Sequence, residues 1–101
     1  MPVIIGYPNQ IAFVGDKIAH ELYKKSKFNL TKKYFEFSAE AYLNDSLKSK
    51  YAEQLTNVGV LNEMTGDYPK AIQNYYVALS IFNELDLEFE KTFIFNNLGI
   101  V

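Results

Sequence analysis

The chain has 101 residues, 49% of them hydrophobic and 22% charged, which suffices for one domain with a single core and excludes an intrinsically disordered chain. It has no cysteine and one histidine, His20, which excludes disulfides, thiolate metal sites and any site that needs two imidazoles. The net charge of −2 conceals an uneven distribution: residues 1–33 carry six lysines and two carboxylates, whereas residues 34–101 carry four lysines and ten carboxylates.

Residues 1–11 are expected to form an N-terminal segment that precedes the repeated helices. Its apolar run, Val3 to Ile5, is far shorter than the roughly 20 residues that cross a bilayer, and no lysine precedes it as in a signal peptide. We therefore expect a cytoplasmic protein without a membrane partner. Pro2–Tyr7 is the one segment whose pattern would permit a β-strand.

Five helices are predicted in all. The first two cover about residues 11–25 and 30–45 and are separated by a break at Ser26–Asn29. The third carries its apolar and small residues at steps of three and four, at Leu55, Val58, Gly59, Leu61 and Met64. The fourth ends around Leu85-Asp86 and is expected to bury Ala71, Ile72, Tyr75, Ala78, Leu79 and Phe82. The fifth begins after Leu87 and carries on its apolar stripe Phe95, Leu98 and Gly99.

The connection between the third and fourth helices has the clearest turn sequence. Gly66 suits the left-handed position that follows the C-terminus of a helix. Asp67 can accept hydrogen bonds from the free N–H groups of the next helix, and Pro69 fits the first turn of that helix. These residues predict a short turn between two antiparallel helices.

The sequence pattern repeats along the chain with a period of about 40 residues, which lies in the range typical of helical repeat proteins. A shift by this period places Phe35 on Tyr75 and Gly59 on Gly99. Small residues would let neighbouring helices approach closely, at Ala19, Ser38, Gly59, Ala71, Ala78 and Gly99. Aromatic residues would fill the wider gaps, at Phe35, Tyr42, Tyr75 and Phe82. The pattern predicts an all-α fold of antiparallel helical hairpins.

The second copy resembles a tetratricopeptide repeat (TPR), as judged from Val58-Gly59, Gly66-Asp67-Tyr68, Ala71-Ile72, Tyr75 and Ala78-Leu79. The period exceeds the roughly 34 residues of the standard repeat and is similar to that of the longer-helix variant of the family. The chain departs from the family pattern at Gly15, in place of a large apolar residue, and at Asn62, in place of an aromatic or aliphatic one. The resemblance implies a short right-handed superhelix with a degenerate repeat over 12–51, a repeat over 52–91 and the first helix of an incomplete repeat over 92–101.

The family binds peptides or partner helices in a concave groove lined by the first helix of each repeat. The resemblance places on that face Lys17, His20, Lys24, Glu53, Thr56, Asn57, Val60, Glu63, Phe93, Asn96, Asn97 and Ile100. Asn57 and Asn97 are expected to hydrogen-bond the backbone of an extended ligand, because an amide supplies both a donor and an acceptor. The basic clamp of chaperone-binding members is not matched, since Asp16 and Phe93 stand where lysines would be needed.

Other function classes lack a matching set of residues. No nucleophile and carboxylate can be placed beside His20, so we expect no enzyme, no catalytic residue, no metal site and no cofactor. The acidic run over residues 84–90 is interpreted as a solvated connection. A lysine cluster could contact phosphates, at Lys24, Lys25, Lys27, Lys32 and Lys33. Because the chain has no arginine and is acidic overall, we expect no nucleic acid partner, and interpret the lysines as favouring an acidic partner segment.

The sequence therefore predicts an interaction module that binds a peptide or partner segment, as part of a larger scaffold or regulatory protein. The alternative is a dimerisation or spacer region of a sensor protein with no ligand of its own. The apolar end, Leu98 to Val101, predicts that the last helix is covered, either by further repeats of a longer protein or by a second copy in a homodimer.

Overall fold

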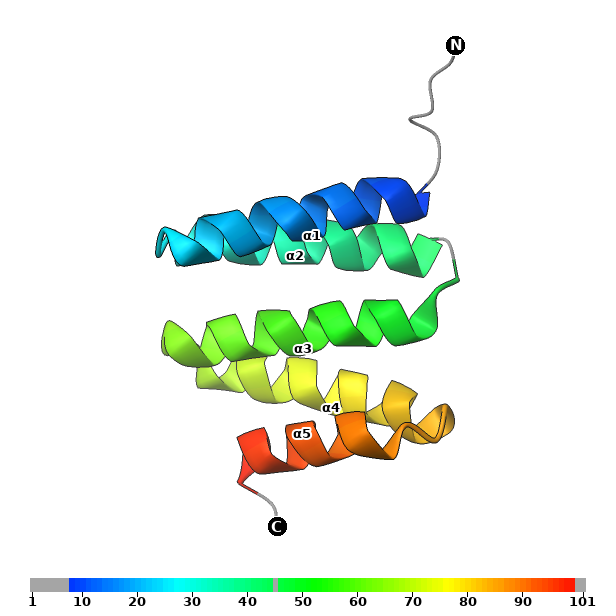
Figure 1. The fold of residues 1–101 in the computed structure, drawn as a ribbon. Helices are drawn as coiled ribbons and strands as arrows, with labels where there is room; N and C mark the ends of the chain where they lie inside the picture. Colours follow the sequence, from blue (N-terminus) through cyan, green and yellow to red (C-terminus); the bar gives the residue numbers. More distant parts are fainter. Residues whose placement is uncertain (1–7, 45, 100–101) are drawn as a thin grey trace.

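The computed structural model describes residues 8–44 and 46–99, and these form helices and turns without a strand (Figure 1). The helices are α1 (Pro8–Lys24), α2 (Phe28–Asn44), α3 (Lys48–Met64), α4 (Tyr68–Glu84) and α5 (Glu88–Leu98). The all-α prediction is therefore confirmed for this part of the chain. The candidate strand at Pro2–Tyr7 lies outside the described residues.

Successive helices run in opposite directions and pack against one another in chain order (Figure 1). As a result α1, α3 and α5 run the same way. The helices begin at positions 8, 28, 48, 68 and 88, so they are evenly spaced along the chain. Every second helix therefore recurs with the period read from the sequence, as the bounds of α1 and α3 and those of α2 and α4 show.

Four turns of the same geometry set this spacing. Each turn has three residues, and the middle one has a left-handed backbone, with φ of 59° at Ser26, 59° at Ser46, 88° at Gly66 and 58° at Asp86. In each turn the next N–H donates to the carbonyl five residues earlier, over 2.7 Å from Asp67 to Asn62 and 2.9 Å from Leu87 to Phe82. This is the Schellman arrangement, which satisfies carbonyls that a helix end leaves free.

The turn predicted at Gly66 is confirmed in its details. Gly66 is left-handed, the Asp67 carboxylate accepts from the Lys70 N–H over 3.4 Å, and Pro69 lies in the first turn of α4. The start of α2 was predicted too late, at about residue 30 rather than at Phe28. The helix starts earlier because the Lys27 carbonyl already accepts the Thr31 N–H, over 2.9 Å.

The core consists of aromatic side chains set against small residues, as predicted. Phe35, Tyr42, Tyr75 and Phe82 are all buried. The predicted small residues are buried with them, at Ala19, Ser38, Gly59, Ala71 and Ala78. A Cβ added at Gly59 would lie 2.7 Å from the Tyr75 ring, so α3 and α4 approach so closely only because this residue is glycine.

Three residues expected on buried faces lie elsewhere. Gly99 is not a close-packing residue: it has φ 78° and ends α5, and an added Cβ would have no atom within 4 Å. Ile72 and Met64 were assigned to apolar stripes but are exposed. Ile72 lines a pocket together with residues of α5, and Met64 is the last residue of α3.

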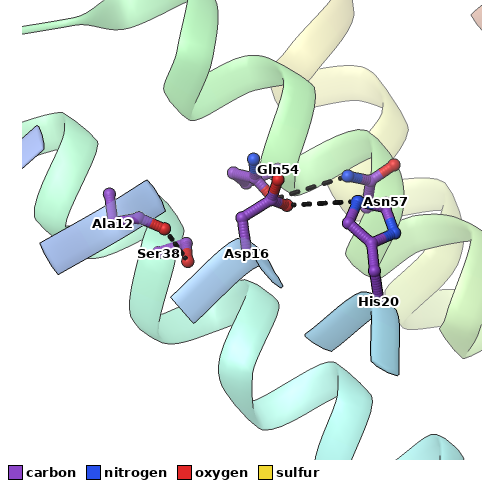
Figure 2. Close-up of polar contacts among 6 residues, drawn as sticks. All are labelled: Ala12, Asp16, His20, Ser38, Gln54 and Asn57. Atoms are coloured by element: carbon purple, nitrogen blue, oxygen red, sulfur yellow. Dashed lines mark hydrogen bonds and ion pairs between the residues drawn. The ribbon is translucent and has the colours of Figure 1, made fainter. Parts of the chain in front are cut away.

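Both departures from the family pattern are accommodated by local contacts. Gly15 leaves room for Ser38, whose hydroxyl donates to the Ala12 carbonyl over 2.8 Å (Figure 2). Asn62 is buried with both ends of its amide paired. Lys32 Nζ donates to Asn62 Oδ1 over 2.9 Å, and Asn62 Nδ2 donates to Asn74 Oδ1 over 2.8 Å, so a polar chain crosses α2, α3 and α4.

Candidate functional site

Two adjoining pockets lie where α1, α3 and α5 come together. The first, of about 240 Å³, is here called the acidic pocket and is lined by Glu53, Thr56, Asn57, Phe82, Phe89, Glu90 and Phe93. The second, of about 250 Å³, is called the apolar pocket and is lined by His20, Tyr23, Phe35, Asn57, Val60, Leu61 and Phe93. Asn57 and Phe93 line both pockets, so the two adjoin at these side chains, and together they are called the shared groove below.

The helix register explains how the groove forms. Because the turns return the chain at equal intervals, His20 of α1, Asn57 of α3 and Phe93 of α5 reach the same side of the molecule. Helices α2 and α4 lie behind and contribute the buried rings of Phe35 and Phe82. Six of the predicted site residues line this groove, at His20, Glu53, Thr56, Asn57, Val60 and Phe93.

His20 lies at the α1 wall of the apolar pocket. Its ring meets the Phe35 ring edge-on with centroids 5.4 Å apart. Its Nε2 lies 3.5 Å from Asp16 Oδ1, one helical turn earlier (Figure 2). These contacts hold the imidazole at the groove.

Asn57 is the polar group at the junction of the two pockets. Its Nδ2 donates to Oε1 of the buried Gln54 over a long 3.4 Å (Figure 2). Among the described residues no donor is bonded to its Oδ1. The amide of this lining residue therefore retains an acceptor without a donor among the described residues.

The acidic pocket combines carboxylates with phenyl rings. Glu53 comes from α3 and Glu90 from the first turn of α5. In the described ranges, neither carboxylate lies within ion-pair distance of a lysine or histidine, unlike Glu21, Glu84 and Glu88. Burial raises the pKa of the nearby Tyr42, and the charges of Asp16 and then Glu53 raise it further. This side of the groove thus carries two carboxylates that no described lysine or histidine neutralises.

Asn97 and Glu63 lie in a different pocket. The Tyr75 hydroxyl donates to Glu63 Oε1 over 2.8 Å, and Asn97 Nδ2 donates to the same hydroxyl over 3.3 Å. Burial and then the hydrogen bond to Glu63 raise the pKa of Tyr75, whereas the hydrogen bond from Asn97 lowers it. The pocket of about 390 Å³ around them is completed by Tyr68, Ala71, Ile72, Tyr76 and Leu98. Asn57 and Asn97 therefore do not line one common groove.

Three of the remaining predicted site residues, Lys17, Lys24 and Asn96, lie outside both pockets of the groove. Lys17 Nζ lies 5.3 Å from the Phe13 ring centroid, and Lys24 pairs with Glu21 over 3.2 Å. Asn96 is exposed on α5. Ile100 lies outside the described residues.

Sequence reasoning missed Tyr23 in the apolar pocket, and in the acidic pocket it missed Phe89 and Glu90. Phe89 and Glu90 belong to the stretch interpreted as a solvated connection, but they form the first turn of α5. The available indication was the shift by one repeat, which places Phe89 and Phe93 on Ser49 and Glu53 of α3. That shift gives the position of a residue on its helix and not which neighbour it faces.

The structure also locates the residues weighed for other functions. Lys32, one of the five clustered lysines, is part-buried against Asn62, and Glu84 pairs with Lys48 over 3.4 Å. Within residues 8–44 and 46–99, no three acidic or histidine side chains gather as a metal site would require. None of the described helices has the length and apolar character needed to cross a bilayer.

Comparison with models of protein families, with curated proteins and with solved structures gives no match to this chain. The likeness to tetratricopeptide repeats therefore rests on the residues named above.

Proposed function

We propose that the chain is a non-enzymatic, cytoplasmic interaction module that binds a peptide or an extended partner segment in the shared groove. The repeats over 12–51, 52–91 and 92–101 would form a short right-handed superhelix with α1, α3 and α5 on its concave side. The observation that carries the proposal is the meeting of residues from these three helices in two adjoining pockets.

The groove offers the two kinds of contact that an extended segment needs. Exposed apolar surface is available at Phe93, which is 48% exposed, and at Phe89, which is 82% exposed. The Asn57 acceptor suits a backbone N–H of the bound segment. Apolar anchors supply affinity, and the backbone contact fixes the register of the segment.

A second function is favoured by the exposure of α5 itself. Two phenylalanines exposed on one short helix are also what a dimerisation surface would present. In that case the chain is a dimerisation or spacer region of a sensor protein. In the first function the partner is a peptide or segment held in the groove. In the second function the partner is a second copy of the chain.

Selection from a random peptide library distinguishes them. We expect the wild-type chain to enrich peptides whose binding is lost in Asn57→Ala and Phe93→Ser. Tyr76→Ser is the matched control, because Tyr76 is 53% exposed but lies outside the groove, and this variant should bind as the wild type does. Circular dichroism checks that each variant remains helical.

The proposal fails if no enriched peptide depends on Asn57 or Phe93. A chain that instead forms dimers that Phe93→Ser dissociates would support the dimerisation function.

A further inference from the structure

The two pockets of the shared groove differ in chemistry, and this difference defines the segment that fits them. The acidic pocket sets two carboxylates, Glu53 and Glu90, among three phenyl rings, Phe82, Phe89 and Phe93. The apolar pocket contains no carboxylate, and its lining includes Tyr23, Phe35, Val60 and Leu61. The inference drawn here rests on the proposed function and specifies the partner.

A basic side chain suits the acidic pocket for two independent reasons. A lysine or arginine would neutralise Glu53 and Glu90, neither of which has an ion-pair partner in the part of the chain that the structure describes. A cation is also attracted to the faces of phenyl rings, and the alkyl stem of either side chain packs on them. Phe89 and Phe93 are exposed enough to make both contacts.

An acidic partner segment does not fit the same groove. The sequence analysis expected an acidic partner because of the lysines in residues 1–33, but neither Lys17 nor Lys24 lines either pocket. Lys24 is paired with Glu21, and Lys32 is paired with Asn62. The charges that face the ligand are those of the glutamates.

We propose that the shared groove selects a protein segment in which a lysine or arginine lies near an aliphatic or aromatic residue. The basic side chain enters the acidic pocket between Glu53 and Glu90, and the apolar side chain enters the apolar pocket beside Val60. The backbone between them crosses Asn57, where an N–H donates to Oδ1.

Fluorescence anisotropy with short labelled peptides tests this assignment. The peptides share a Gly-Ser backbone and one leucine, and carry either lysine, glutamine or glutamate, with one or three residues between the two side chains. We expect the lysine peptide to bind about tenfold more tightly than the glutamate peptide at low salt, and the difference to shrink as salt is added.

A pair of charge-matched variants locates the preference. Glu53→Gln with Glu90→Gln should abolish the preference for lysine. Glu36→Gln with Glu40→Gln changes the net charge equally on exposed residues of α2 and should retain it.

Each other outcome contradicts a specific claim. Equal binding of the three peptides, or equal loss of the preference in both double variants, would overturn the basic partner and leave peptide binding intact. No binding by any peptide of this panel or of the random library would overturn the proposed function itself. Light scattering could instead show concentration-dependent dimers that dissociate in Glu53→Gln with Glu90→Gln but not in the control double variant. That result would identify the occupant of the groove as the lysines of residues 1–33 of a second copy.

Discussion

Tyr75 links three helices through one side chain. Its ring lies against Gly59 of α3, and its hydroxyl binds Glu63 of α3 and Asn97 of α5. The sequence predicted Tyr75 as a core residue and Asn97 as a ligand contact, but not that the two are bonded to each other. The period assigns each residue a position on its helix, whereas this bond depends on the packing of α5 against α4.

The raised pKa of Tyr75 predicts a loss of stability at high pH. Folding favours the neutral phenol, so the folded chain holds this proton to a higher pH than the unfolded chain, whose tyrosine pKa is about 10. The stabilisation is complete below that pH, and the free energy of unfolding falls as pH rises past it. Urea unfolding between neutral pH and pH values above 10 measures this loss. In Tyr75→Phe the decline should be shallower, with the remainder due in part to Tyr42, whose pKa is also raised.

The turns are the element that determines the helix register. The sequence identified the one turn that has glycine and missed the left-handed residue in the other three, because serine and aspartate occur in many turn types and do not by themselves specify this conformation. The predicted helix bounds were accordingly within a few residues of the observed ones. Their recurrence is nevertheless strict, since the same hydrogen bonds close each turn.

Because the middle residue of each turn has a left-handed backbone, substitutions at two of these residues should change the free energy of unfolding in opposite directions. Ser26→Gly should stabilise the chain by up to about 1 kcal/mol, because glycine adopts a φ near 59° without the Cβ penalty. Gly66→Ala should destabilise it by about 1 kcal/mol, although an added Cβ meets no atom within 4 Å. Urea unfolding measures both changes, and an unaltered free energy of unfolding in Gly66→Ala would contradict this account of the turns.

At the scale of the whole molecule, the repeat explains both what was predictable and what was not. The sequence predicted that first helices share a face, and His20, Asn57 and Phe93 do line one groove. It did not predict the acidic pocket, because Glu53 and Glu90 lie far apart in the chain and meet only through the packing of α5. The period therefore predicts the face of the helix on which a residue lies, but not the side chains of other helices that it contacts.

The central claim is that the shared groove captures a peptide, and an NMR titration tests it most directly. An isotope-labelled chain would be titrated with the leucine-lysine peptide, and the side-chain amide of Asn57 and the methyl groups of Val60 observed. We expect their signals to shift in a saturable way, while those of Ile72, in the separate pocket around Tyr75, remain in place. Shifts confined to Ile72 and its neighbours, or no saturable shift at Asn57 and Val60, would contradict the account.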